Sequence, residues 1–219
     1  MSTQVVSREV VVGPTRSFLT LGGACAVVAG VATFLYSVAF VVLKAATLYS
    51  LLQLVGSLAA TVALVALYQR LRETDPGLAL WLVLTGVVAG MGSAIHGAYD
   101  LSNALNPPRT DVLTDANLPN LVDPRGFLTF AVAGLALLAA SWLMSRTAGF
   151  PVPLAYLGYV LGLLMILTWL ARLTVLDATS PLVLLPAALT GFLANPAWYI
   201  WLGLVLLRQR GPVSKASVS

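Results

Sequence analysis

Residues 18–43 read FLTLGGACAVVAGVATFLYSVAFVVL, a run of 26 residues without an acidic or basic side chain. In an α-helix, about 20 apolar residues cross the roughly 30 Å hydrocarbon core of a bilayer. The run is also much longer than the ~7–15 apolar residues of a secretory signal peptide. We therefore predict a first transmembrane helix here.

Five further apolar runs have the same character. Backbone N–H and C=O groups cannot stay unpaired in lipid, so runs of this length must be helices. They lack the alternating polarity of outer-membrane barrel strands. The predicted fold class is an all-α integral membrane protein, a six-transmembrane-helix bundle. It forms one membrane domain, 18–207, with cytoplasmic tails at 1–17 and 208–219. The five runs are 46–68, 78–99, 125–145, 153–175 and 182–207.

The overall composition agrees with a membrane protein. Hydrophobic residues make up 59% of the 219 residues and charged residues 9%, whereas a soluble domain carries about 25% charged residues. This balance excludes a soluble enzyme, a disordered tail protein and a nucleic-acid binder, although the net charge is +4. The single cysteine, Cys25, cannot form an internal disulfide.

The basic residues predict the direction of the chain, since cytoplasmic loops are enriched in Lys and Arg. With the N-terminus inside, eight basic residues lie on the inner side and four on the outer side. We therefore expect a multi-pass protein of the plasma or inner membrane with both termini cytoplasmic. The inner residues are Arg8, Arg16, Arg70, Arg72, Arg146, Arg208, Arg210 and Lys215, and the outer ones are Lys44, Arg109, Arg125 and Arg172.

Several helix ends are marked by proline. An N-cap side chain followed by proline is typical of a helix start, because the cap oxygen accepts a free N–H and proline has none to lose. The pairs Asp75-Pro76, Asp123-Pro124 and Ser180-Pro181 have this form. Asn106-Pro107 is expected to end the third helix, because a residue before proline disfavours the helical region.

Two passages share a spacing that indicates an internal repeat. Thr74-Asp75-Pro76 precedes Leu84-Thr85-Gly86, and Thr179-Ser180-Pro181 precedes Leu189-Thr190-Gly191, at a shift of 105 residues. Units of three helices at 14–99 and 123–207 would be inverted relative to each other, as in many transporters. The alternative is chance, because Leu, Ala, Gly and Val recur throughout the chain.

Polar residues on one face of the third span form the main candidate site. Ser93, His96 and Asp100 follow at offsets of three and four residues, which places them on one side of a helix. His96 and Asp100 would lie near the outer end, where such a pair is suited to sensing pH or relaying protons. Alternatively, His96 hydrogen-bonds a neighbouring helix and Asp100 sits at the water interface.

Arg172, in the outer part of the fifth span, is the second candidate. An arginine at that depth must reach water or pair with an acid, and Asp100 and Asp177 are the nearest acids by depth. As a bidentate donor it would suit an anion or a carboxylate. The structural alternative is an arginine that reaches the interface with Asp177 as its partner.

Asn195 and Gln53 complete the predicted ligand-binding set. Pro196 removes a backbone N–H and is expected to kink the sixth span, so Asn195 would cap the break or hold a ligand. Gln53 lies in the outer half of the second span. Polar side chains cost most where they face lipid, so all of these residues are expected to point inward.

Two short motifs resemble known families but do not extend to a catalytic or channel signature. Gly90-Met91-Gly92-Ser93 resembles the serine motif of rhomboid proteases, which need a histidine from a later helix, and the only histidine here is His96. Asn195-Pro196-Ala197 matches the triplet of aquaporin-type channels, which carry two such triplets in re-entrant loops. No catalytic residue, cofactor or metal ligand is predicted, because the chain lacks the residues for bis-histidine haem, a zinc site or a phosphate loop.

The sequence therefore favours a non-enzymatic membrane protein that binds or transports a small solute or proton. The expected site is the outward-facing cluster of His96, Asp100, Arg172, Asn195 and Gln53. A competing interpretation is an accessory or assembly subunit, in which glycine stripes pack a partner protein and the polar groups only join helices. A third is a membrane-embedded enzyme that uses Asp100 or His96.

Overall fold

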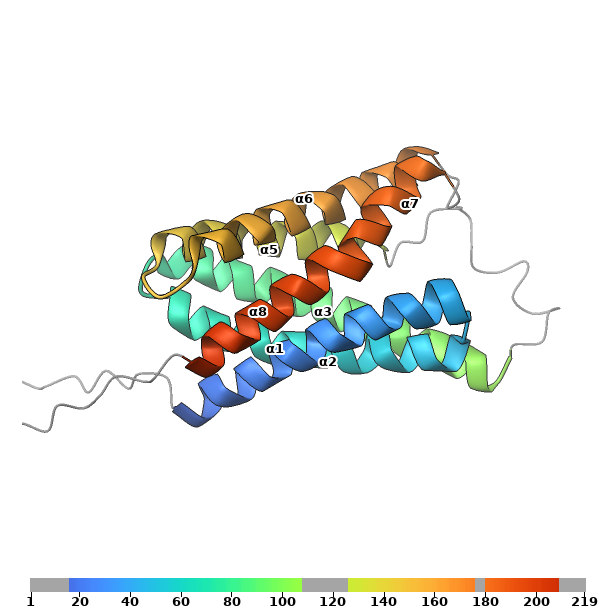
Figure 1. Cartoon of the computed structure of the whole chain (residues 1–219), viewed down its shortest axis with the longest axis horizontal. Helices are drawn as coiled ribbons and strands as arrows, with labels where there is room; N and C mark the ends of the chain where they lie inside the picture. Colours follow the sequence, from blue (N-terminus) through green and yellow to red (C-terminus); the bar gives the residue numbers. More distant parts are fainter. Residues whose placement is uncertain (1–15, 108–125, 176–179, 209–219) are drawn as a thin grey trace, which may run out of the picture.

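The computed structural model describes residues 16–107, 126–175 and 180–208, and within these ranges the chain is helical without strands. Six helical segments in these ranges are long and apolar enough to cross a membrane (Figure 1). This arrangement is compatible with a polytopic membrane protein and confirms the six-helix prediction. The six are Ser17–Leu43, Ala46–Leu71, Pro76–Leu105, Phe127–Arg146, Val152–Val175 and Pro181–Arg208.

Three of these segments are uniform α-helices and three combine α-helix with a wider π-helical turn. The elements are α1 (Arg16–Ser37), η1 (Val38–Leu43), α2 (Ala46–Leu71), α3 (Pro76–Leu105), η2 (Phe127–Val132), α5 (Ala133–Arg146), α6 (Val152–Val175), α7 (Pro181–Ala188), η3 (Leu189–Ala194) and α8 (Asn195–Arg208).

The predicted spans agree with the helices within a few residues, except that the apolar run of the third span stops at residue 99 whereas α3 continues to Leu105. The helix end predicted at Asn106-Pro107 is confirmed. The helix ends where its stop signal lies: Asn106 is the C-cap, and its N–H donates to the Ser102 carbonyl at 2.9 Å. Asp100 is therefore inside the helix, where its position relative to His96 is fixed.

Proline-marked helix starts differ in how they are capped. Asp75 caps α3 as predicted, since its Oδ1 accepts from the Leu78 N–H at 2.9 Å. Ser180 occupies the N-cap position of α7, but its side chain makes no cap hydrogen bond, so that part of the prediction is wrong. The third predicted start, Asp123-Pro124, lies outside the described residues, as do both predicted tails except residues 16, 17 and 208.

The helices pack so that each span contacts its sequence neighbours, and the last span closes the bundle against the first. α1 packs along α2 and α8, α2 along α3, α3 along α5, and α5 along α6. The start of α1, the end of α8 and the connections after α2 and α5 lie at one end of the bundle, here called the Arg70 end (left in Figure 1). The other end is called the Asp100 end.

The bundle has a tight interior and an apolar exterior. Large side chains such as Leu67, Leu82, Leu143 and Trp198 have no measurable exposure, and alanines fill many remaining core positions. Outside, Leu84, Ile95 and other large apolar side chains are more than half exposed. Soluble monomers rarely expose extensive apolar surface, so this exterior suits lipid.

A π-helical segment lies where the sequence predicts a break in the sixth span. The missing N–H of Pro196 leaves the carbonyl of Phe192, four residues earlier, without its helical partner. Phe192 lies within η3 (Leu189–Ala194), and Asn195 and Pro196 then begin α8. All three described π-helical segments lie in the half of their span nearer the Asp100 end. Such wide turns occur frequently at functional sites, and here they lie in the half of the bundle that carries the predicted polar cluster.

Candidate functional site

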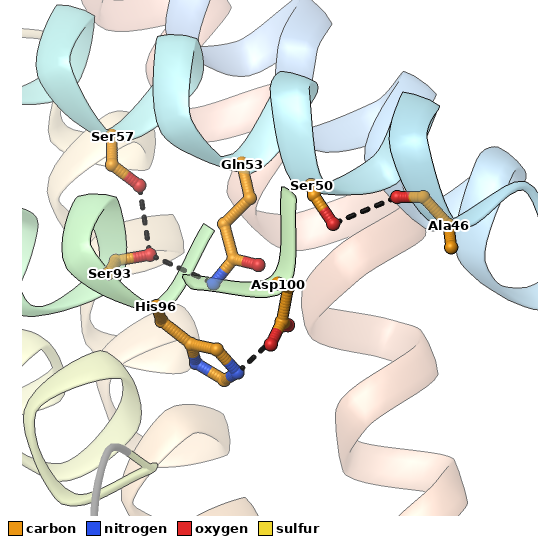
Figure 2. Close-up of polar contacts among 7 residues, drawn as sticks. All are labelled: Ala46, Ser50, Gln53, Ser57, Ser93, His96 and Asp100. Carbon is orange, nitrogen blue, oxygen red and sulfur yellow. Dashed lines mark hydrogen bonds and ion pairs between the residues drawn. The ribbon is translucent and has the colours of Figure 1, made fainter. Parts of the chain in front are cut away.

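A hydrogen-bonded network joins α2 to α3 at the level of the predicted cluster (Figure 2). Ser57 Oγ donates to Ser93 Oγ at 2.8 Å, and Gln53 Nε2 donates to the same oxygen at 3.4 Å. Ser57 and Gln53 are one turn apart on α2, so both reach a single hydroxyl on α3. The structure therefore brings Gln53 to the face of α3 that carries Ser93.

Gly97 allows the two helices to come this close. A Cβ atom at this position would lie 2.8 Å from the Leu54 backbone nitrogen, 2.9 Å from the Ser50 carbonyl oxygen and 3.2 Å from the Gln53 Cβ. Two of these neighbours are backbone atoms of α2, which cannot move independently of that helix. Gly97 thus packs against α2 of the same chain.

His96 and Asp100 meet one turn further along α3. His96 Nε2 lies 3.3 Å from Asp100 Oδ2, and Figure 2 shows the imidazole directed at the carboxylate. Their side chains are 18% and 25% exposed, so the pair is partly shielded. Both residues also interact with other groups in the structure. The predicted helix-face contact is therefore present.

An aromatic group from the first hairpin borders this pair. The rings of Tyr36 and Phe40 stack, with centroids 5.7 Å apart, and Tyr49 packs edge-on against both at 6.1 and 5.1 Å. The Tyr36 hydroxyl lies within electrostatic range of Asp100, Tyr49 and Arg172. Tyr36 is thus near enough to the acid of α3 and the arginine of α6 to interact with both electrostatically. No local motif in the sequence indicated its ring contact with Tyr49.

Arg172 is half-buried at the Asp100 end of α6. Its Nη1 lies 3.9 Å from the position that a Cβ on Gly126 would occupy, so the guanidinium reaches towards the start of the fourth span. Among the described residues it forms no ion pair with Asp100. The other predicted partner, Asp177, lies outside the described residues.

Asn195 sits apart from the hydrogen-bonded network. Its Oδ1 is buried and accepts no hydrogen bond from the described residues, so it does not cap the break in the sixth span. The following residue, Pro196, packs its carbonyl against Gly30 of α1. In the described part of the chain Asn195 forms no hydrogen bond with Gln53, His96 or Asp100.

One pocket of the described bundle lies at the opposite end from these residues. It has a volume of about 260 Å³ and is lined by polar groups of the two connections at the Arg70 end. Within the described ranges, no group of three potential metal ligands (His, Cys, Asp or Glu) comes together. The lining residues are Gln69, Arg70, Glu73, Thr74, Thr147 and Ala148.

No protein-family model, curated protein or solved structure shows significant similarity to this chain. The chemistry of the site therefore comes from its own residues. The Asp100 end offers a histidine–carboxylate pair, two phenols, a cation and a serine–glutamine network, which together can hold a proton or a small polar molecule.

Proposed function

We propose that this chain is a polytopic membrane protein that binds, and moves across the bilayer, a proton or a small solute at the Asp100 end. The observation that carries the proposal is the contact between His96 and Asp100, 3.3 Å apart and partly exposed on an apolar helix. Ionisable residues within membrane spans are costly and usually mark proton or solute pathways.

Neighbouring groups make this site suitable for a polar ligand. Tyr36 offers a hydroxyl within electrostatic range of both Asp100 and Arg172, so donors and acceptors of both charge signs border one region. Gln53 and Ser93 continue the polar face towards the middle of the bundle through the 3.4 Å hydrogen bond. Asn195, with its buried Oδ1 in the sixth span, provides an acceptor beside the wide turn of η3.

The competing proposal is an accessory or assembly subunit whose polar groups only join helices. The Ser57–Ser93 hydrogen bond at 2.8 Å favours it, because it ties α2 to α3 without a ligand. However, the glycines expected to receive a partner helix already pack internally. Gly97 lies against α2, and Gly162 lies against Gly134 of α5.

Proton movement is the sharpest test of the proposed site. The purified chain is reconstituted in liposomes that contain a pH-sensitive dye, and the internal pH is followed after an external pH step. We expect His96→Gln and Asp100→Asn each to reduce the flux at least tenfold. Ser102 is an exposed residue near the same end of α3, and Ser102→Ala should leave the flux unchanged.

A thermal-shift screen of small carboxylates then tests solute binding, which Arg172→Gln should abolish. Equal flux and equal ligand response in all of these variants would refute the proposal and leave the accessory function.

We also propose the membrane orientation, with both termini cytoplasmic and the Asp100 end outside. Its support is the excess of Lys and Arg at the Arg70 end. The test replaces Cys25 by serine and introduces one cysteine at an exposed position, Thr74 at the Arg70 end or Ser102 at the Asp100 end. An impermeant maleimide added to intact cells should label Ser102→Cys but not Thr74→Cys, and the reverse pattern contradicts the orientation.

Finally, we propose that residues 14–99 and 123–207 are inverted repeats. The support is the spacing shared by the third and sixth spans and the odd number of helices in each unit. The sixth span packs differently from the third span, its counterpart in the first unit. The sixth lies mainly along α1, whereas the third lies mainly along the span before it, α2. Superposition of the two units in an experimental bilayer structure tests the idea, which fails if the three helices do not overlay in order.

A further inference from the structure

The sixth span carries an unsatisfied hydroxyl where its helix is wide. Thr190 lies in η3 and is 5% exposed, and its Oγ1 forms no hydrogen bond among the described residues. In the α-helical parts of the bundle, buried hydroxyls donate instead to the carbonyl four residues earlier. Thr168 donates in this way to Leu164, and Ser141 to Leu137, each at 2.7 Å. The unsatisfied hydroxyl therefore accompanies the wide turn.

An α-helical turn would satisfy this hydroxyl from within the span. The carbonyl four residues before Thr190 is that of Pro186, which now accepts from the Leu189 N–H. A carbonyl has two lone pairs, so it can accept a second hydrogen bond. The same pattern recurs in η2, where the buried Oγ1 of Thr129 also forms no hydrogen bond among the described residues. Because an unsatisfied buried donor costs free energy, Thr190 favours an α-helical form of η3.

Pro196 acts in the opposite direction. In a continuous α-helix its ring would collide with the carbonyl four residues earlier, that of Phe192. The wide turn avoids this collision, because its hydrogen bonds join residues five apart, as when the Asn195 N–H donates to the Thr190 carbonyl. The π-helical form thus leaves a hydroxyl unsatisfied, whereas the α-helical form kinks at proline. Transmembrane helices tolerate such kinks, so the two forms lie close in free energy.

α7 is the part of the sixth span that can turn. Changing one π-helical turn into an α-helical turn shifts the register by one residue, which rotates α7 relative to α8 by about 100°. α8 holds six buried residues and packs along α1, whereas α7 packs against α6 and holds one, Val183. All residues of α7, PLVLLPAA, are apolar. After the rotation, Leu182 or Leu184 can therefore replace Val183 against α6 without exposing a polar group to lipid.

Gly191 transmits this rotation to the first span. A Cβ at its position would lie 2.5 Å from the Oγ of Ser37, the last residue of α1. When η3 turns, Thr190 or Phe192 replaces glycine at this contact, and either side chain displaces the end of α1. Ser37 follows Tyr36, which lies within electrostatic range of the acid and the arginine of the candidate site. A turn of the sixth span therefore moves a group that borders that site.

We propose that the sixth span is a two-state switch, in which η3 exchanges between its π-helical form and an α-helical form kinked at Pro196. In the α-helical form Thr190 donates to the Pro186 carbonyl, α7 is rotated, and the end of α1 carries Tyr36 away from its present position. Through this movement the switch controls proton or solute passage at the Asp100 end. That control rests on the function proposed above, whereas the exchange itself does not.

The exchange is measured on the full chain in nanodiscs, as the distance between two spin labels by electron paramagnetic resonance. Cys25 is replaced by serine, and labels are attached to Leu185→Cys on α7 and Ile95→Cys on α3, both 63% exposed. A side chain ends about 5–6 Å from its helix axis, so a 100° rotation displaces the α7 label by about 8 Å. Wild type should show the present distance and a smaller population with a shifted distance.

Two substitutions bias the exchange in opposite directions. Pro196→Ala restores an N–H and should raise the population with the shifted distance at least fivefold. Adding Thr190→Val to that variant removes the hydrogen bond to the Pro186 carbonyl and should reverse at least half of this increase. Two controls should leave the populations unchanged. Pro186→Ala restores an N–H outside η3 and keeps the carbonyl, and Thr168→Val removes a buried hydroxyl that is bonded within α6.

A single distance in both wild type and Pro196→Ala overturns the switch, as does a population that Thr190→Val does not change. Proton flux in liposomes tests the control of transport. Pro196→Ala should differ in flux at least threefold from the variant that also carries Thr190→Val, and equal flux overturns that control. His96→Gln should lower the flux without altering either distance. Failure of the transport site is therefore distinguishable from failure of the switch, because the distances do not depend on flux.

Discussion

Replacing Gly97 by alanine tests whether close contact between α2 and α3 positions the candidate site. The new Cβ would lie 2.8 Å from a backbone nitrogen and 2.9 Å from a backbone carbonyl oxygen of α2. Ordinary van der Waals contact of a Cβ begins near 3.4 Å. The helices must therefore separate by roughly half an ångström, because a close-packed interior has no spare volume to absorb the methyl group.

The expected cost follows from known effects of overpacking. An extra methyl group in a packed core lowers the free energy of unfolding by about 1–3 kcal/mol, and the better helix propensity of alanine returns up to about 1 kcal/mol. We expect a net loss of about 1–2 kcal/mol, which lowers the folded-to-unfolded ratio about 5- to 30-fold. The same separation would lengthen the Gln53–Ser93 hydrogen bond, now 3.4 Å.

The free energy of unfolding is measured by titration from mild detergent into SDS and followed by circular dichroism. Gly77→Ala is the matched control, because among the described residues its Cβ position has one neighbour within 4 Å, the Asp75 side chain 3.6 Å away. We expect this control to be neutral or slightly stabilising. If Gly97→Ala is as stable as Gly77→Ala, the close approach of α2 and α3 is not what fixes the site, and the reasoning fails.

Three further substitutions separate local contributions to the free energy of unfolding. Asp75→Ala removes the N-cap of α3 and should cost about 1 kcal/mol; an unchanged SDS midpoint contradicts the cap. Ser93→Ala removes the acceptor of the Ser57 hydroxyl and should cost about 0.5–1.5 kcal/mol, a prediction that fails if Ser57→Ala and the double variant are additive with it. Arg146→Gln removes the cation–π contact with Trp142 and should cost at most about 1 kcal/mol; a larger loss would assign Arg146 a different role.

Much of the architecture could be predicted because the bilayer constrains the chain so strongly. Apolar runs of this length had to be helices, so five of the six predicted spans agree with the helices within a few residues at both ends. The exception is the end of α3, where hydropathy falls at Asp100 but helix propensity continues until the signal at Asn106. A break in hydropathy marks the edge of an apolar run, whereas a break in hydrogen bonding marks the end of a helix.

The candidate site was predictable only within one helix. A spacing of four residues is enough to bring His96 to Asp100, so the sequence contained that contact. The convergence of Gln53 and Ser57 on Ser93 depends on how α2 lies against α3. Asn195 shared the predicted depth of the cluster but lies outside its hydrogen-bonded network, because depth alone does not define which way a helix face turns.

By itself, the sequence determined the helical spans, their number and the i to i+4 contacts, because these depend on local hydropathy and helical periodicity. The tertiary structure decided which helices lie side by side, that Tyr36 lies within electrostatic range of both Asp100 and Arg172, and that a polar pocket forms where two distant connections meet. The physical reason is that packing between helices depends on small residues and close approach. Gly97 is an example: because it has no side chain, α3 can pack closely against α2, and the local sequence pattern does not predict which helix it packs against.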